Sequence, residues 1–408
     1  MRLMVYSHDA YGLGNLRRML AICTHLLAEI PNLSILLISG SPMLHSFRLP
    51  KGLDYIKLPC LNRGLFGNLS AKYLGTDTEE TIHLRSQLIL SATSNFKPDL
   101  LLVDKKPYGI NHELAETLNF LQEKRPQVKR VLLLRDILDR SDRTIAEWQK
   151  HDYYGAIQSL YHQVLVVGDP DVFNLTQEYQ FPLAAAQKVR FCGYIRKPMG
   201  DRSRTEIRQE LRVQAPDRLV VVTPGGGEDG YGLIDAYLAG LKLRSPQACK
   251  SLIIFGPEMP LPQQEELRYR ASYLPDVQWL EFTDDLMSYL DAADVVVSMA
   301  GYNTTCEILS LSKPAVVVPR HKPSEEQLIR AERLASRGLL TMVHPDRLAP
   351  SSLIEAVWQQ LDSPLNFIAA NRVDLNGLSR ISHHMQTLLA DGPSGRAASL
   401  SHASTVVI

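Results

Sequence analysis

The sequence predicts an α/β fold with two units, each built on a parallel sheet. The first observation is length, because 408 residues are too many for one ordinary core and suit two domains. The second is an alternation of short apolar runs, with the length of buried strands, and stretches with helical periodicity. The third is the set of small residues that follow several of these runs, as in the βαβ units of parallel sheets.

The first half of the chain predicts the elements of one unit. Apolar runs predict strands at residues 3–6, 33–38, 53–58, 99–104, 129–134, 163–167 and 189–192. Helical periodicity between them predicts helices at residues 19–30, 78–96 and 111–123. Asp104 closes one strand and is expected at the carboxyl edge of the sheet, where ligands bind in open α/β folds. Asp169 and Asp171 form a D-x-D pattern, but Pro170 between them indicates a turn and not a metal site.

The second half repeats the alternation and predicts a second unit. Its apolar runs predict strands at residues 219–223, 251–255, 277–281, 295–297, 315–318 and 340–343. Helices are predicted at residues 204–211, 233–241, 350–361 and 376–389. The final residues, 391–408, are small and polar, and this composition predicts a disordered tail.

Composition narrows the class of function. Lysine plus arginine and aspartate plus glutamate both number 44, so the net charge is zero and gives no electrostatic case for a nucleic-acid partner. No apolar run approaches the roughly 18 residues that a membrane span needs. The five cysteines form no CxxC pattern and predict buried thiols in a reducing cytosol, namely Cys23, Cys60, Cys192, Cys249 and Cys306.

The densest group of candidate site residues follows the strand at 295–297. Ser298 ends this strand, and the small residues Ala300 and Gly301 allow a ligand to approach the backbone. Thr304 and Thr305 can cap the helix that follows. A helix that begins at a small-residue turn offers backbone N–H groups to a phosphate.

Glu307 lies three residues after Thr304 and has two interpretations. It can complete a capping box by bonding backbone at the helix start. Alternatively, its carboxylate can bind the hydroxyls of a ribose whose phosphates lie at the same helix end. A second phosphate-binding element is predicted at Gly225, Gly226 and Gly227, because three glycines between a buried strand and a helix form a loop whose N–H groups can face phosphate oxygens.

The order of these residues closely resembles the nucleotide-sugar half of family 28 glycosyltransferases. That family includes the enzyme that adds N-acetylglucosamine to peptidoglycan lipid precursors and the plant galactolipid synthases. The segments VDKKPYG and LRDILD are also similar to a bacterial group of predicted glycosyltransferases related to this family. The matching residues are Ser298, Ala300, Gly301, Thr304, Glu307, Pro314, Pro319, Glu326, Gln327, Ala331 and Gly338.

The resemblance implies a GT-B fold, in which two Rossmann-like domains face each other across a cleft. Residues 1–195 would form the acceptor-side domain and residues 196–365 the nucleotide-sugar domain. Residues 366–390 would contain a helix that crosses back to the first domain, followed by the tail.

The resemblance also implies donor-binding roles in the second domain. The counterpart of Glu307 binds ribose, and the counterparts of Glu326 and Gln327 reach the sugar. An arginine of the family reaches the diphosphate, and Arg196 is the nearest match, although its spacing is one residue short. We include Asn303, next to Thr304, among the donor-binding candidates. The expected donor is a UDP-sugar, with no metal and no cofactor.

The first loop is the acceptor-side candidate. It contains Gly12 and Gly14, but Asn15 stands where the family commonly has histidine, and asparagine cannot act as a base. His8, Asp9 and Asp104 are therefore the candidates for the catalytic base. His8 is preferred because its ordinary pKa of about 6.5 suits proton transfer at neutral pH, although a structural hydrogen bond is an equal alternative.

These features together predict an inverting glycosyltransferase that uses no metal. It would move a sugar from a UDP-sugar to the hydroxyl of a small-molecule or lipid-linked acceptor. The alternatives are a nucleotide-sugar hydrolase of the same fold and a degenerate nucleotide-sugar-binding protein. We expect a cytoplasmic location. Leu65 and Phe66, between Arg63 and Lys72, suggest weak peripheral contact with the inner face of the membrane or an acceptor-side loop with a packed phenylalanine.

Overall fold

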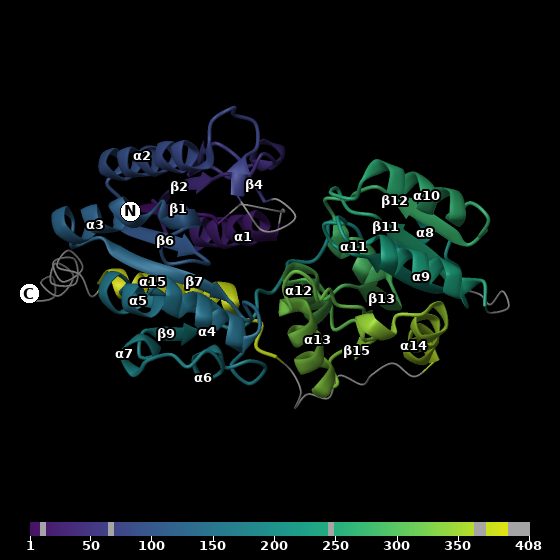
Figure 1. Cartoon of the computed structure of the whole chain (residues 1–408). Coiled ribbons are helices and arrows are strands. Elements are labelled where there is room, and N and C mark those ends of the chain that lie inside the picture. Colours follow the sequence, from purple (N-terminus) through teal and green to yellow (C-terminus); the bar gives the residue numbers. More distant parts are fainter. Residues whose placement is uncertain (9–13, 64–68, 244–248, 363–372, 391–408) are drawn as a thin grey trace, which may run out of the picture. The chain divides into compact units, whose positions relative to one another are not determined.

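The computed structural model describes residues 1–8, 14–63, 69–243, 249–362 and 373–390. The chain divides into two compact units (Figure 1). The first contains residues 1–136 and 141–193, together with the C-terminal helix that follows residue 376. The second contains residues 194–375 and the short segment 137–140.

The first unit is built on a seven-stranded parallel sheet in the order β3-β2-β1-β6-β7-β8-β9. The order places the first strand of the chain between β2 and β6, so the sheet grows in both directions from it. Its strands are β1 (Arg2–Tyr6), β2 (Ser34–Ser39), β3 (Leu53–Lys57), β6 (Leu100–Asp104), β7 (Lys129–Arg135), β8 (Gln163–Val167) and β9 (Val189–Phe191).

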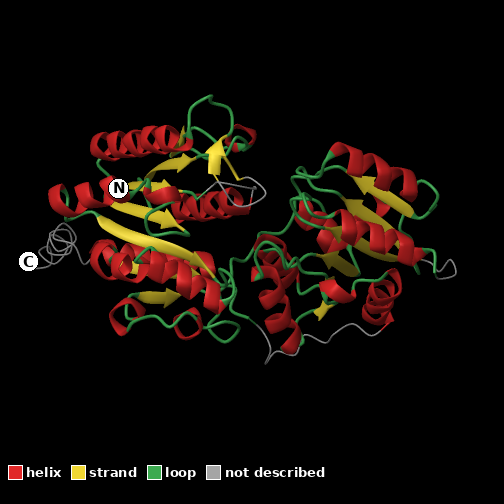
Figure 2. Ribbon diagram, in the orientation of Figure 1, coloured by secondary structure: helices red, strands yellow, loops and turns green. Residues whose placement is uncertain are grey.

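Helices cover both faces of this sheet (Figure 2). They are α1 (Gly14–Glu29), α2 (Thr78–Phe96), α3 (Ala115–Lys124), α4 (Ser141–Lys150), α5 (Tyr153–Leu160), α6 (Leu175–Glu178) and α7 (Leu183–Ala186), with short 3-10 helices at Leu44–Ser46 and Ile110–His112. The last helix, α15 (Gly377–Ala390), belongs to this unit and packs against α1, so the chain returns to the first unit as expected.

The second unit has a six-stranded parallel sheet in the order β12-β11-β10-β13-β14-β15. Its strands are β10 (Arg218–Thr223), β11 (Cys249–Ile254), β12 (Val277–Leu280), β13 (Val295–Ser298), β14 (Ala315–Val317) and β15 (Thr341–Met342). Its helices are α8 (Arg204–Glu210), α9 (Tyr231–Leu241), α10 (Leu261–Ala271), α11 (Leu286–Ala292), α12 (Tyr302–Leu311), α13 (Glu326–Ser336) and α14 (Pro350–Asp362), with a 3-10 helix at Pro345–Arg347.

The core of the second unit explains why its strands read as unbroken apolar runs. Val220 and Val222 of β10 pack with Val295 and Val297 of β13, and all four are fully buried. Central strands of a parallel sheet are covered on both faces, so they need apolar residues at consecutive positions and not at alternate ones. Tyr237 of α9 and Leu353 of α14 extend this core from the helices.

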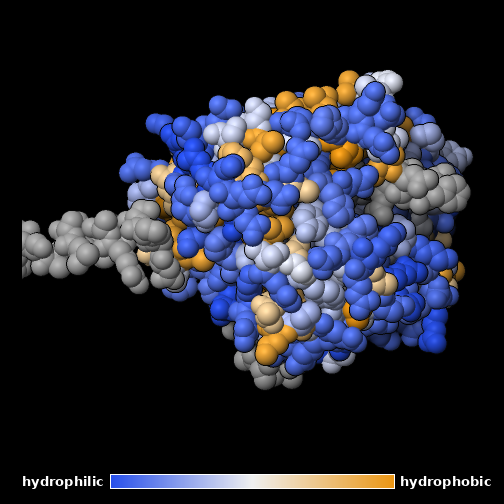
Figure 3. Space-filling model, turned by 60° about the vertical axis from the view of Figure 1, so that its left-hand side comes forward, coloured by the Kyte–Doolittle hydropathy of each residue, from blue (hydrophilic) through white to orange (hydrophobic). Residues whose placement is uncertain are grey.

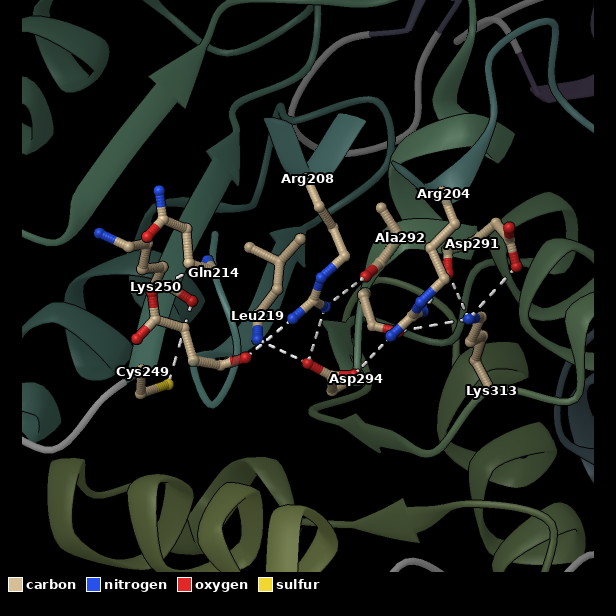
Figure 4. Close-up of polar contacts among 12 residues, drawn as sticks. Arg204, Arg208, Gln214, Leu219, Cys249, Lys250, Asp291, Ala292, Asp294 and Lys313 are labelled. Atoms are coloured by element: carbon tan, nitrogen blue, oxygen red, sulfur yellow. Dashed lines mark hydrogen bonds and ion pairs between the residues drawn. The ribbon is translucent and has the colours of Figure 1, made fainter. Parts of the chain in front are cut away.

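Charged residues form a network at the edge of the second sheet where the amino ends of its strands lie (Figure 4). Asp294, just before β13, accepts a hydrogen bond from the backbone N–H of Leu219 at 2.8 Å and pairs with Arg204 at 2.6 Å and Arg208 at 3.0 Å. Arg208 also donates to the carbonyl of Ala292 at the carboxyl end of α11, so cations complement the free carbonyls of that helix end.

Two parts of the first unit differ from the sequence-based expectation. Residues 61–71, expected as a loop, contain a short antiparallel pair, β4 (Leu61–Arg63) and β5 (Leu69–Ala71). Helix α1 begins at Gly14, five residues before the predicted start, so Gly14 and Asn15 belong to its first turn. The D-x-D turn is confirmed, because the Asp169 carboxylate accepts from the backbone N–H of Asp171 at 2.9 Å.

Candidate functional site

The candidate donor site lies at the carboxyl edge of the second sheet. Thr223, Ser298 and Val317 are the last residues of β10, β13 and β14. These strands are adjacent and parallel, so the loops that follow them meet at one edge. The three loops supply the predicted glycines, the start of α12 and the approach to α13.

The turn between β13 and α12 leaves a helix end open. Ser298 is buried, Ala300 has a left-handed backbone with φ of +56°, and Gly301 precedes the helix in an extended conformation. Within the described part of the chain, no side chain caps this helix. The first N–H groups of a helix have no partner inside the helix, so an uncapped start can bind an anion.

The predicted cap at Thr304 and Thr305 is wrong. Helix α12 begins at Tyr302, because the left-handed Ala300 turns the chain early and puts Gly301 in the capping position. Thr304 is therefore the third helical residue and Glu307 the sixth. A capping box needs its acidic residue at the third position, so Glu307 cannot complete one. Its side chain is only 2% exposed, which makes it a buried carboxylate in the second turn.

The glycine-rich loop after β10 approaches the start of α12. A Cβ atom added to Gly225 would lie 3.5 Å from the hydroxyl oxygen of Thr304. Gly225 and Gly227 have φ of +91° and +99°, and a side chain on Gly227 would clash with the carbonyl of Phe255. The backbone conformation therefore explains why glycine stands at positions 225 and 227. Gly226, in contrast, is exposed and has no positive φ.

Helix α13 carries two further candidates, and one of them, Gln327, approaches the same turn. The Gln327 amide nitrogen lies 3.8 Å from the position of a Cβ atom on Gly301. Its amide oxygen accepts a hydrogen bond from the backbone N–H of Arg320 at 3.1 Å, which fixes the orientation of the side chain. Glu326 is the first residue of α13 and is buried.

Two basic residues at the site were not predicted from the sequence. The Lys197 ammonium lies 3.4 Å from the side-chain oxygen of Asn303, and the Lys197 backbone N–H donates to Ser310 at 2.9 Å. The side chain of Arg196, the predicted residue, is exposed. Arg330 of α13 is fully buried and donates to the carbonyl of Ala300 at 3.1 Å. A signal existed for Arg330, because helical spacing places it on the buried face with Leu334.

Two buried hydroxyl groups at this edge are candidates to bind a ligand. The side-chain oxygens of Ser298 and Thr305 are buried and have no hydrogen-bond partner among the described residues. Buried polar groups normally have a partner, and those that lack one often face a ligand or water. Both residues flank the open turn, one at the end of β13 and one in the first turn of α12.

The base candidates of the first unit lie at the carboxyl ends of β1 and β6. The Asp104 carboxylate pairs with Arg18 at 2.7 Å, and both side chains are almost fully buried. Its other oxygen accepts from the backbone N–H of His8 at 3.4 Å. These two contacts give Asp104 a structural role and disfavour it as the base. Asn15 donates to the His8 carbonyl at 2.8 Å, so it supports the same strand end.

His8 is 7% exposed, and its environment favours the neutral imidazole. Burial lowers the pKa of His8 well below its ordinary value, and the nearby Lys105, Lys106, Arg85 and Arg135 lower it further. A neutral imidazole can accept a proton, but a lowered pKa makes it a weaker base. The sequence-based preference for His8 as the base assumed the ordinary pKa of histidine, whereas the pKa of His8 in the structure is lowered.

Several expectations fall outside the described residues. These are the ones that involve Asp9, Gly12, Leu65, Phe66 and the tail at 391–408. Near the expected membrane contact, Tyr73 and Leu74 are exposed by 68% and 46%. On the face that Figure 3 shows, hydrophobic residues form small groups separated by hydrophilic ones.

Among the described residues, no helix is long and apolar enough to span a membrane. The same residues contain no group of three His, Cys, Asp or Glu side chains that could hold a metal ion.

Comparisons with known proteins relate this chain to glycosyltransferases. Residues 221–385 match the glycosyltransferase family 28 C-terminal domain. An uncharacterized glycosyltransferase from Methanopyrus kandleri is 29% identical over 210 residues, which are 51% of this chain and 56% of that protein. A UDP-N-acetylglucosamine–N-acetylmuramyl-(pentapeptide) pyrophosphoryl-undecaprenol N-acetylglucosamine transferase from Glaesserella parasuis is 34% identical over 77 residues, 19% of this chain and 22% of that enzyme.

The matched stretches therefore span about half of the first of these relatives and less of the second. Among solved structures, MurG from Acinetobacter baumannii superposes with a TM-score of 0.60 at 13% identity, covering 95% of this chain and 99% of that one. At this identity the likeness shows the fold. The chain thus has the GT-B fold, and its residues 221–385 match the glycosyltransferase family 28 C-terminal domain.

Proposed function

We propose that the protein transfers a sugar from a UDP-sugar to an acceptor hydroxyl, with inversion at the anomeric carbon and without a metal. The observation that carries this proposal is the uncapped start of α12, which the Gly225–Gly227 loop approaches and beside which Glu307 is buried. The uridine nucleotide is suggested by the Glaesserella parasuis relative, whose name specifies UDP-N-acetylglucosamine.

The diphosphate would lie at the start of α12. Diphosphate is the leaving group of the reaction, so negative charge grows on it in the transition state. The N–H groups of Tyr302, Asn303 and Thr304 are fixed dipoles that can stabilise this charge without reorganising. Lys197 adds a positive charge beside Asn303. It is the proposed contact to the diphosphate, a role that the resemblance implied for Arg196. Dipoles and a lysine together can replace the charge that a metal ion supplies in other transferases.

The ribose and the sugar would contact acidic and amide groups on α12 and α13. Glu307 is buried in the second turn of α12 and is not a cap, which favours its ribose-binding interpretation. A carboxylate accepts hydrogen bonds from two hydroxyls, and such charge-assisted bonds are strong. Gln327 and Glu326 lie at the start of α13, and Gln327 faces the same turn. They are the proposed sugar contacts.

The acceptor would bind to the first unit, with His8 as the proposed base. His8 follows β1 at the carboxyl edge of the first sheet, and its neutral imidazole can take the proton of an attacking hydroxyl. The name of the Glaesserella parasuis relative includes an undecaprenol-linked substrate, which favours a lipid-linked acceptor here over a small molecule. Such an acceptor would require peripheral contact with the cytoplasmic face of the membrane.

The rival functions share the donor site. A hydrolase would use water as the acceptor, and a degenerate protein would bind the nucleotide sugar without turnover. The second rival rests on Asn15 in place of histidine, but Asn15 has a structural role of its own through its bond to the His8 carbonyl. The substitution therefore does not by itself indicate lost activity.

A thermal-shift panel of nucleotide sugars tests the proposal. A ligand that binds only the folded state stabilises it by RT ln(1 + [L]/Kd), so the true donor should raise Tm most. We expect UDP-sugars and UDP to raise Tm, and CMP- or GDP-sugars to have little effect. No shift with any uridine nucleotide would contradict the proposal.

A further inference from the structure

We infer that Arg330 is a positioning residue that holds the donor-binding turn in its active shape without touching the donor. This inference rests on the proposed function of the same site. Arg330 lies on α13 and is fully buried, although arginine is rarely buried. Its guanidinium donates to the Ala300 carbonyl at 3.1 Å and lies 5.6 Å from the centre of the Tyr302 ring.

The turn combines an unfavourable backbone conformation with the lack of a side-chain cap, so a contact from another element would stabilise it. Ala300 adopts a left-handed backbone that is unfavourable for a residue with a side chain. Gly301 offers no side chain to bond the helix start, and no other described side chain caps it. The helices α2, α5, α8 and α11 of this chain are each capped by a side chain, from Asp77, Asp152, Ser203 and Asp285. A side-chain cap on α12 would occupy the N–H groups that the diphosphate needs.

Arg330 supports the turn through the Ala300 carbonyl and the Tyr302 ring and does not cap the helix start. It bonds the carbonyl of Ala300 and covers the ring of Tyr302, so it fixes residues on both sides of Gly301. The planar guanidinium can do both at once, because its edge donates hydrogen bonds while its face stacks on an aromatic ring. A lysine could supply the charge but not this combination.

Helix α13 thereby links two parts of the donor site. Gln327 lies three residues before Arg330, so the two side chains share one face of the helix. The Gln327 amide approaches Gly301 while Arg330 bonds Ala300. The helix that presents the proposed sugar contacts therefore also holds the turn that presents the diphosphate N–H groups.

The test uses two single variants at Arg330, one double variant that tests rescue, and a matched control. Arg330→Met removes the guanidinium, and Arg330→Lys keeps the charge. Arg208→Met is the control, because Arg208 is also a mostly buried arginine of the second unit, and it lies at the amino edge of the sheet. UDP affinity is measured by calorimetry, and amide hydrogen exchange of residues 299–305 is measured without ligand.

We expect Arg330→Met to weaken UDP binding by about tenfold or more and to speed exchange at residues 299–305. Arg330→Lys should lie between this variant and the parent. Arg208→Met should lower Tm but leave both readouts at the parent level. Adding Ala300→Gly to Arg330→Met should restore part of the affinity, because glycine adopts the left-handed backbone without strain.

The outcomes separate this inference from the proposed function. Unchanged exchange at residues 299–305 in Arg330→Met would overturn the positioning role, and so would unchanged UDP affinity. Absence of rescue by Ala300→Gly would contradict it as well, because it would indicate that Arg330 acts on the nucleotide directly. If the parent binds no UDP, the proposed function fails, and faster exchange in Arg330→Met alone would still support the positioning role.

Discussion

At the scale of single residues, Glu307 is the proposed ribose-binding carboxylate. Glu307→Gln removes the charge and keeps the shape of the side chain. UDP affinity should fall by about 1.5–3 kcal/mol, the usual worth of a hydrogen bond to a charged group. Calorimetric titration with UDP measures the loss. A lower Tm with unchanged UDP affinity would show that the residue is structural.

His8 is the second residue whose role can be tested directly. His8→Ala should reduce kcat by about 10²–10⁴-fold, the usual contribution of a general base, while leaving UDP affinity unchanged. The pKa of His8 is lowered by burial and by nearby lysines and arginines. The acidic limb of the pH profile of kcat should therefore lie below about pH 6.5, the ordinary pKa of histidine. Full activity of His8→Ala would move the search for the base to Asp9.

The sequence indicated which residues belong to the candidate site only where those residues are part of a motif. Ser298, Gly301, Glu307 and Gln327 became candidates because their order and spacing form a pattern, and the structure places them at one edge of one sheet. Lys197 and Arg330 belong to no such pattern. They reach the site through contacts made by the folded chain, from the segment before α8 and from the buried face of α13.

At the scale of elements, the glycine-rich loop after β10 is expected to contact the diphosphate. Gly226 is the residue to change. Gly225 and Gly227 have positive φ, so substituting either would strain the backbone as well as alter binding. Gly226→Val should abolish UDP binding with only a small loss of stability, since its Cβ would meet only the end of the flexible Glu258 side chain. Titration with UDP and thermal unfolding measure the two effects. Parent-like affinity would remove the loop from the site.

The charged network at the amino edge of the second sheet gives an independent prediction on stability. Burial would raise the pKa of Asp294, but its bonds from Leu219, Arg208 and Arg204 outweigh burial and lower it. A carboxyl with a lowered pKa stabilises the folded state above its unfolded pKa, and this stability is lost as pH falls through the folded value.

Asp294→Asn should therefore lower the free energy of unfolding at pH 7 by about 1–3 kcal/mol. The difference from the parent should shrink as pH falls below about 4, near the ordinary pKa of the group. Urea unfolding at several pH values measures it. Because the network lies far from the strand ends that carry the site, UDP affinity should not change. A difference that grows on acidification would contradict this account.

The start of α12 shows why element boundaries were harder to predict than element types. Threonine is a common capping residue, so Thr304 and Thr305 were expected to begin the helix. The structure begins it at Tyr302, because Ala300 takes a left-handed backbone that its residue type does not favour. Support from Arg330, a residue about one helix and one strand further along the chain, makes that conformation stable.

At the scale of the whole molecule, the parallel sheets were largely predictable. Their buried strands need continuous apolar runs, and most observed strands lie within one or two residues of the predicted ones. The short pair β4 and β5 was missed, because three-residue strands in a polar segment leave no periodic signal. The resemblance to family 28 predicted the GT-B fold and the candidate residues of the second unit, but the motif is shared by enzymes that use different sugars and does not identify the sugar.

The central claim is that the protein transfers sugar from a UDP-sugar with inversion and without a metal. The most direct measurement is NMR of the reaction of the donor found by thermal shift with candidate acceptors, with EDTA present and absent. We predict a product of inverted anomeric configuration, formed at the same rate in EDTA and dependent on the acceptor. A product of retained configuration, turnover abolished by EDTA, or donor consumption that is independent of the acceptor would contradict it.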